Sequence, residues 1–135
     1  MRIPGIQSVG YAPCAALQPH IVLKAIAGEP VTALAAFTRI RFCDIPVAKK
    51  ESETDDGGGE IETATLIFTT ETPLPSGRFA FEVMDMAGRL YLIGSKEPPY
   101  PRISVEYTTG LPGGDPAVYK YTITHKALKT LIANF

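Results

Sequence analysis

The sequence predicts a mainly β fold: an antiparallel β-sandwich or partly open barrel of about seven to eight strands, formed by a single domain over residues 1–135. Three observations indicate this fold. The 12 glycines and 12 prolines fall between apolar runs, as in short strands joined by turns. Several of these runs alternate apolar and polar residues. Apolar residues make up 45% and charged residues 20% of the chain, as in globular domains.

The apolar runs predict strands at residues 5–12, 20–27, 31–43, 60–70, 78–85, 89–94, 102–109 and 117–125. The run "AVYKYTIT" alternates strictly, with Tyr119, Tyr121, Ile123 and His125 on one face and Lys120, Thr122 and Thr124 on the other. The run "RISVEYT" directs Ile103, Val105 and Tyr107 inward, and Arg102, Ser104 and Glu106 outward. In "RFAFEVMD", the residues that share a face are Phe79, Phe81 and Val83.

Residues 31–43 alternate less cleanly. Val31, Ala33, Ala35 and Phe37 share one parity, whereas Ile40 and Phe42 have the other. A bulge near residues 37–39 would reconcile the two halves of one strand. A helix over 31–38 is the alternative: its three alanines favour it, and the β-branched residues in it oppose it. We favour the strand.

The C-terminal segment 126–133 leaves two alternatives open. Thr124 can cap a short helix on which Leu128, Leu131 and Ile132 have helical spacing, and an extended tail fits the segment equally well.

Residues 48–60, "AKKESETDDGGGE", are charged, rich in glycine and free of aromatic residues. Such a segment buries too little apolar surface to offset the entropy lost on ordering. The sequence therefore predicts a flexible loop at 48–60.

The stretch "EVMDMAGRLYLIGSKEPPYP", residues 82–101, predicts a hairpin with its exit loop. Asp85 and Gly88 occupy the first and fourth positions of a type I turn, where Asp accepts hydrogen bonds from the backbone and Gly tolerates a positive φ. Asp85 is therefore assigned to the turn. Ser95 and Lys96 lack the S-x-x-K spacing and the neighbouring base that a nucleophilic serine requires.

Other candidate residues give no site. His20 and His125 have no metal-ligand spacing around them, and Cys14 and Cys43 are expected to be thiols. Ser52, Thr54 and Asp56 alternate as in calcium loops but miss the EF-hand pattern. The run "TGLPGGDP", residues 109–116, lacks the Lys-Ser/Thr pair of a phosphate-binding loop. We expect no catalytic, cofactor-binding or metal-binding residues, hence no enzyme and no cofactor.

A net charge of −1 and a pI near 6.1 argue against nucleic acid or a membrane as a partner. Arg39 and Arg41 share a strand face, but Tyr119 and Tyr121 lie opposite Lys120, which favours core aromatics over a base-stacking platform. "MRIPGIQSVGYAP" has no apolar signal-peptide region, and "AALQPHIVLKAIAG" is too short and interrupted to span a bilayer. The protein is expected to be cytoplasmic.

The late half combines an Asp85–Gly88 turn, an apolar run ending at Gly94, a proline-containing connection, Thr109-Gly110, a loop with Asp115 and an alternating strand through Tyr121. Over roughly residues 82–130, this order resembles small β-rich structural proteins of tailed phages and prophages, of the tail or neck class. The resemblance implies a non-enzymatic structural or assembly protein that acts through protein–protein contacts, and it carries no catalytic residues.

The partners that this resemblance implies are other copies of the chain or other virion proteins, with a homo-oligomer as one expected form and the virion as the final location. The first strand, 5–12, and the loop 48–60 are the expected contact elements. The alternative is a β-sandwich binding module for a small ligand, a carbohydrate or nucleic acid. A hydrolase whose residues converge only in three dimensions is a more distant third hypothesis.

Overall fold

The computed structural model describes residues 5–17, 19–20, 23, 26–27, 37–42, 46–54, 60–96, 100–108, 118–127, 130 and 132–133. These residues form nine strands and a 3₁₀ turn, η1 (Cys14–Ala16), and Leu23 and Ile26 are helical. The strands are β1 (Ile6–Pro13), β2 (Thr38–Arg39), β3 (Val47–Thr54), β4 (Glu60–Thr70), β5 (Phe79–Asp85), β6 (Leu90–Ile93), β7 (Arg102–Thr108), β8 (Val118–Ala127) and β9 (Ile132–Ala133).

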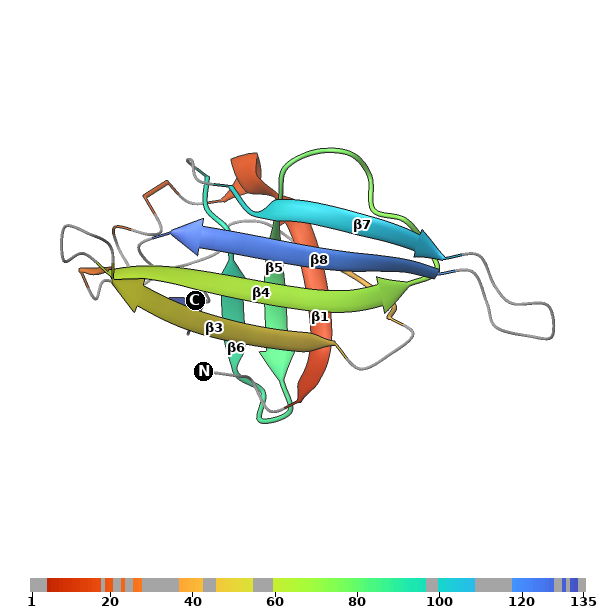
Figure 1. Ribbon diagram of the computed structural model, residues 1–135, viewed down its shortest axis with the longest axis horizontal. Helices are drawn as coiled ribbons and strands as arrows, with labels where there is room; N and C mark the ends of the chain where they lie inside the picture. Colours follow the sequence, from red (N-terminus) through yellow and green to blue (C-terminus); the bar gives the residue numbers. More distant parts are fainter. Residues whose placement is uncertain are drawn as a thin grey trace.

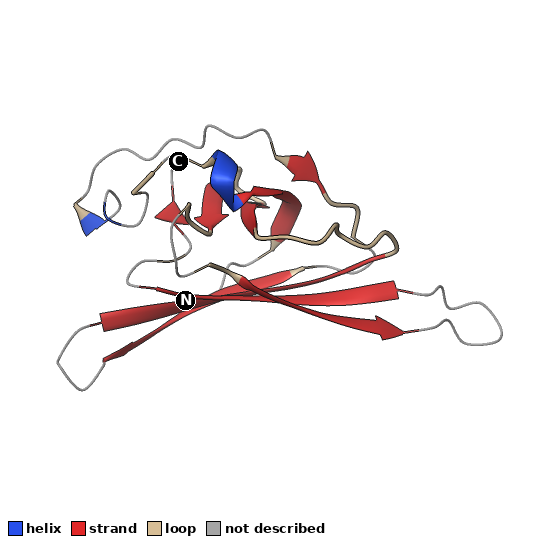
Figure 2. Ribbon diagram, turned by 90° about the horizontal axis from the view of Figure 1, so that it is seen from above, coloured by secondary structure: helices blue, strands red, loops and turns tan. Residues whose placement is uncertain are grey.

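The strands make two antiparallel sheets that lie face to face. One has the order β2-β1-β5-β6-β9 and the other β3-β4-β8-β7. Figure 1 shows the four-stranded sheet in front, with its strands crossing those of the five-stranded sheet behind it, and Figure 2 shows the two layers from above. The crossing is that of an orthogonal β-sandwich. The predicted mainly β fold is therefore confirmed, in its sandwich form, since the sheets do not close into a barrel.

The core lies between the sheets and follows the alternation of the strands. On β4 the inward positions hold Ala64, Leu66 and Phe68, and on β5 they hold Phe79, Phe81 and Val83. The predicted inward residues Tyr121, Ile123 and His125 of β8 are buried, as expected. A smaller apolar cluster covers the opposite, outer face of the five-stranded sheet, and it contains Cys14, Leu17, Ala80 and Leu92.

Two predicted strands near the N-terminus need correction. Strand 20–27 is wrong at its described residues, because Leu23 and Ile26 are helical and the amide of Ala27 donates to the carbonyl oxygen of Leu23 at 3.0 Å. Among the described residues of the predicted strand 31–43, only Thr38 and Arg39 form a strand; residues 31–36 and 43 lie outside the described part. The predicted bulge near residues 37–39 would place the apolar residues of both halves on one face. This is wrong at the described residues, because Phe37 packs against the outer cluster whereas Ile40 belongs to the main core.

The predicted loop 48–60 is wrong over residues 48–54, which belong to β3; residues 55–59 lie outside the described part. β3 pairs with β4 over eight residues, from Val47↔Ile67 to Thr54↔Glu60. The charged composition suggested a loop, but a strand at the edge of a sheet can carry charges on its solvent face. The first strand is not the free edge we expected either, because β2 pairs with β1 at Gly10 and Tyr11.

The C-terminal segment takes the extended alternative. Lys126 and Ala127 continue β8, and β9 pairs with β6 through Ala133↔Tyr91 and Ile132↔Leu92. The chain thus passes from one sheet to the other between β8 and β9. A buried carboxylate marks this passage: Oε1 of Glu62 accepts a hydrogen bond from the amide of Thr130 at 2.9 Å, and Oε2 lies 3.6 Å from Nζ of Lys50.

Candidate interface at the edge of the four-stranded sheet

β7 forms one edge of the four-stranded sheet. It pairs with β8 from Arg102↔Thr124 to Thr108↔Val118, and no other strand among the described residues pairs with it. In Figure 1 it is the uppermost strand of the front sheet. One side of this seven-residue backbone is therefore a row of amide and carbonyl groups open to another strand.

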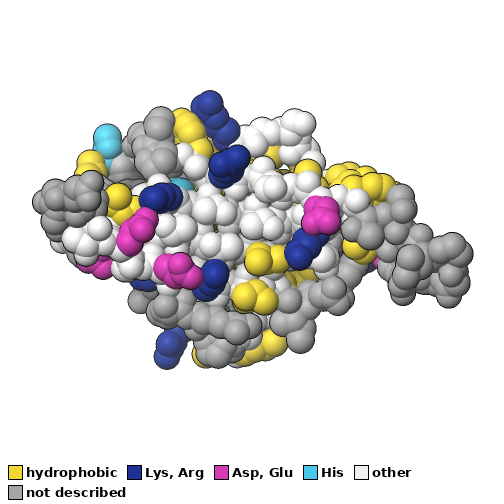
Figure 3. Space-filling view, viewed as in Figure 1, with side chains coloured by type: hydrophobic (Ala, Val, Ile, Leu, Met, Phe, Trp, Pro, Cys, Tyr) yellow, Lys and Arg dark blue, Asp and Glu magenta, His cyan; other side chains and the backbone are white. Residues whose placement is uncertain are grey.

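The apolar side chains of β7 lie on the core-facing side but extend past the core. Val105 is opposite Tyr121 and Tyr107 is opposite Tyr119, so the predicted face is confirmed for both. The predicted burial is wrong, because Val105 is 53% exposed and Tyr107 is 54% exposed, whereas Tyr121 is 4% exposed. The rings of Tyr107 and Tyr119 pack with their centroids 4.7 Å apart. Figure 3 shows hydrophobic side chains at the surface near the right-hand end of β7.

The other sheet edges among the described residues are short or charged. β2 and β9 have two residues each. β3 carries two lysines and two glutamates, with ion pairs Lys49–Glu51 at 3.2 Å and Glu53–Lys126 at 3.0 Å. Short strands and charged edge residues are the usual protection against the addition of another strand. β7 has no charged side chain on its core-facing side, so it is the least protected of the four edges.

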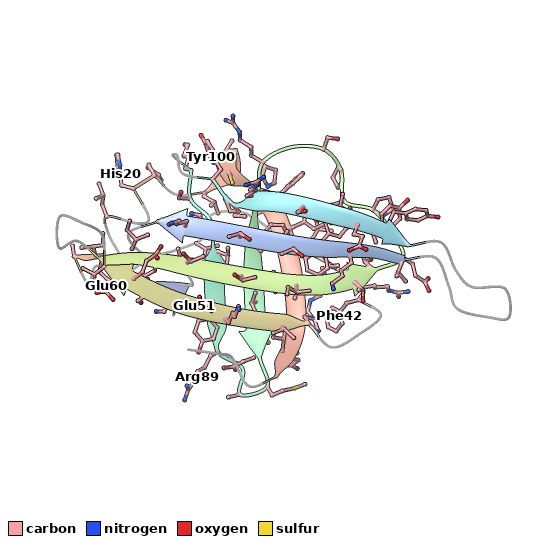
Figure 4. The ribbon with its side chains drawn as sticks, in the orientation of Figure 1. His20, Phe42, Glu51, Glu60, Arg89 and Tyr100 are labelled. Atoms are coloured by element: carbon pink, nitrogen blue, oxygen red, sulfur yellow. The ribbon has the colours of Figure 1, made fainter. Side chains whose placement is uncertain are left out.

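The outer face of the four-stranded sheet is rich in hydroxyl groups. Its centre holds Thr63, Thr65, Thr69, Thr122 and Thr124, beside Ser104 of β7. Figure 3 shows this uncharged centre in white, with charged side chains around it, and Glu51 of β3 is labelled in Figure 4. On β7 itself, the outward charges are Arg102 at one end and Glu106 toward the other, as predicted.

The hairpin prediction for residues 78–94 is confirmed. The amide of Gly88 donates to the carbonyl oxygen of Asp85 at 3.1 Å, and Gly88 has φ +84°. Oδ1 of Asp85 accepts hydrogen bonds from the amides of Ala87 and Arg89, each at 2.9 Å. Asp85 thus stabilises the turn between β5 and β6.

Ser95 and Cys14 meet on the outer face of the five-stranded sheet, where both are buried, while Lys96 is exposed. Burial raises the pKa of the Cys14 thiol; a hydrogen bond from the backbone of Ser95 and the charge of Arg78 only partly offset this effect. A thiol with a raised pKa is a weak nucleophile at neutral pH. Cys43 lies outside the described residues.

The remaining candidates are separated in space or belong to the core. His20 is exposed, whereas His125 is buried on the inner face of β8, and Figure 4 shows His20 at the surface. In the described part of the chain, no three His, Cys, Asp or Glu residues are grouped so as to hold a metal ion. Ser52 and Thr54 lie on β3, and Asp56 and the loop 109–116 lie outside the described residues. Across the residues that the structure describes, no helix has the length and apolar character needed to cross a membrane.

Sequence reasoning missed two features of this sheet. The exposure of Val105 and Tyr107 depends on how far the second sheet reaches, which no local pattern reports. The burial of Glu62 could have been predicted from the sequence, because in the alternating strand β4 it lies on the same face as the apolar residues Ala64, Leu66 and Phe68.

Comparison with known proteins adds no relative: no protein-family model matches the chain, and neither does any curated protein or solved structure.

Proposed function

We propose that the protein is a non-enzymatic structural or assembly protein of phage or prophage origin that acts through protein–protein contacts. The observation that supports the proposal is the edge strand β7, which combines unpaired backbone groups with two apolar side chains that are more than half exposed. An added strand would form main-chain hydrogen bonds with β7 and bury these side chains at the same time. The phage origin is carried by the resemblance of residues 82–130.

The test is the self-association of the protein at rising concentration, followed by sedimentation or light scattering. We expect the mass of the wild-type particle to rise above 14.5 kDa, and Val105→Lys to remain monomeric. An inward-pointing lysine on an edge strand opposes strand addition because its charge would be buried in the contact. Ser52→Lys is the matched control: it places the same charge on the inner side of the opposite edge strand, β3, opposite the buried Glu62.

Both variants must first show thermal unfolding close to that of the wild type. The proposal requires that Ser52→Lys associates as the wild type does. It is contradicted if Val105→Lys associates equally well. A strict monomer at millimolar concentration that a sugar or oligonucleotide stabilises would instead favour the binding module.

A groove supports that second candidate function, a module that binds a small ligand. The groove has a volume of about 310 Å³. It lies between Thr38–Arg41 of the β2 segment and a wall at the end of β4 and just after it, formed by Thr70, Thr72, Pro73 and Leu74. Arg39 and Arg41 line it, none of its described lining residues is a carboxylate, and Tyr11 and Ile40 supply apolar surface. One wall is held in place, because the amide of Leu74 donates to the hydroxyl oxygen of Tyr121 at 2.8 Å. Such a groove suits a small organic anion with an apolar body.

Benzoate, with benzamide as its uncharged counterpart, tests this candidate by titration of the amide NMR signals. We expect benzoate to shift the signals of Tyr11 and Arg41, and Arg41→Gln to weaken binding about tenfold through loss of a charge-assisted hydrogen bond. The control is Arg89→Gln, on the turn of the β5–β6 hairpin (Figure 4), which removes the same charge outside the groove. Equal binding of benzamide, or no effect of Arg41→Gln, would argue against the groove as an anion site.

A further inference from the structure

We propose that β7 pairs with β7 of a second copy of this chain, antiparallel and with Ser104 opposite Ser104 of that copy. This inference rests on the proposed function and names the partner at the same site. It would join the two four-stranded sheets into one continuous sheet across a two-fold axis. A two-fold contact uses the same surface on both copies. In a favourable register, the charged residues of β7 in each copy therefore lie opposite residues of opposite charge in the other copy.

The charges of β7 favour this register. Arg102 and Glu106 lie on the outer side, two residues before and two residues after Ser104. With Ser104 on the axis, Arg102 of each copy lies opposite Glu106 of the other, which gives two ion pairs. Opposite charges at directly opposed positions stabilise antiparallel strands, and like charges destabilise them.

The neighbouring two-fold registers are less favourable. Any residue of β7 can lie on the axis, because the residues opposed to each other then always have the same parity and share a face of the sheet. If Arg102 or Glu106 lay on the axis, it would face the same residue of the second copy, which is a like-charge contact. Ile103 or Val105 on the axis would place Ser104 opposite one charged residue and leave neither ion pair formed.

The apolar side of β7 fits the same register. Ile103 of each copy lies opposite Val105 of the other, so two exposed valines gain an apolar neighbour. Pro101 precedes the strand and has no amide hydrogen, so it would limit the ladder to Arg102–Glu106 with Tyr107 at its end. Aliphatic pairs directly opposed across strands contribute to the stability of a sheet.

Charge reversal tests the register. Arg102→Glu and Glu106→Arg each place two like-charge pairs in the contact, and we expect each to weaken self-association on the order of tenfold at low salt. The double variant restores opposite charges at both places and should associate as the wild type does. The difference between single and double variants should shrink in high salt, because the pairs are exposed.

A disulfide supplies an independent readout. Ser104→Cys, in a Cys43→Ser background, places two thiols opposite each other on the axis, where cross-strand Cβ atoms are about 4.5–5.5 Å apart. We expect mild oxidation to give a covalent dimer. Thr122→Cys is the matched control, since Thr122 is the β8 neighbour of Ser104 on the same face and would lie one strand further from the axis.

The outcomes separate the two proposals. One outcome is that Val105→Lys abolishes association, the double charge variant does not restore it, and Ser104→Cys gives no covalent dimer. This outcome overturns the register with Ser104 on the axis and leaves β7 as the contact. A wild-type protein that stays monomeric at millimolar concentration overturns the pairing of β7 with itself. Equal cross-linking of Thr122→Cys and Ser104→Cys likewise overturns it.

Discussion

Gly94→Ala should destabilise the protein much more than the same substitution at Gly88. Both glycines have a positive φ, +132° at Gly94 and +84° at Gly88, so an alanine at either position meets backbone strain. The space around them differs. A Cβ at Gly94 would lie 2.7 Å from Cβ and 3.0 Å from Cα of Ala80, whereas a Cβ at Gly88 would have no heavy atom within 4 Å.

The magnitudes follow from these contacts. Left-handed backbone costs a residue with a Cβ about 1–2 kcal/mol, which is the whole expected effect at Gly88. At Gly94 the clash with β5 adds about 1–3 kcal/mol of overpacking, because the Cα of Ala80 cannot move without its strand. The expected loss is therefore about 2–5 kcal/mol at Gly94, a large part of the about 5–15 kcal/mol that stabilises a typical domain.

Equilibrium unfolding in urea measures both losses, with the slope of the transition compared to show that the unfolded state is unchanged. Gly88→Asn is the control, since Asn accepts the left-handed region better than Ala does. Equal losses for Gly94→Ala and Gly88→Ala would refute the close approach of Gly94 to Ala80. A neutral Gly88→Ala would refute the turn geometry.

Three further predictions concern the buried residues Glu62 and Cys14 and the partly buried Glu82. Glu62→Ala should cost about 1–3 kcal/mol in urea unfolding, because the amide of Thr130 loses its acceptor, and Glu62→Gln should cost less; equal losses would contradict the role of the hydrogen bond. Burial raises the pKa of Glu82, with Arg39 only partly offsetting it, so ionisation of Glu82 disfavours the fold. The stability from its protonated form is complete below the unfolded pKa of about 4.3 and is lost as pH rises through the folded pKa. Glu82→Gln should therefore raise the melting temperature at pH 7 relative to the wild type, with the gain shrinking toward pH 4; a constant gain would point to another cause. Cys14, in a Cys43→Ser background, should react with iodoacetamide only after unfolding, and fast labelling of the folded protein would contradict its burial.

The parts of the fold that the sequence predicts are those with local causes. The β5–β6 hairpin follows from Asp85 and Gly88, whose hydrogen bonds span no more than four residues. The faces of β5, β7 and β8 follow from alternation, which is a property of a single strand. Neither the turn residues nor the alternation of a single strand indicates which strands are neighbours in a sheet.

The failures have non-local causes. β3 is a strand because β4 pairs with it along eight residues, although its own charged residues are typical of a loop. Alternation assigns Val105 and Tyr107 to the correct face, but their exposure depends on how far the opposite sheet extends over β7. The candidate interface is a product of strand order, so it could be recognised only in three dimensions.

Because the chain passes from β8 in one sheet to β9 in the other, β6 can pair with β9 only late in biosynthesis. β6 precedes its partner β9 by about forty residues, so on the ribosome the edge of β6 at Tyr91 and Leu92 remains open until Ile132 and Ala133 have been synthesised. Over the same interval the carboxylate of Glu62 lacks the amide of Thr130. A nascent chain therefore exposes a second strand edge that the folded protein covers, and it is most vulnerable to pairing with a neighbouring nascent chain before β9 emerges.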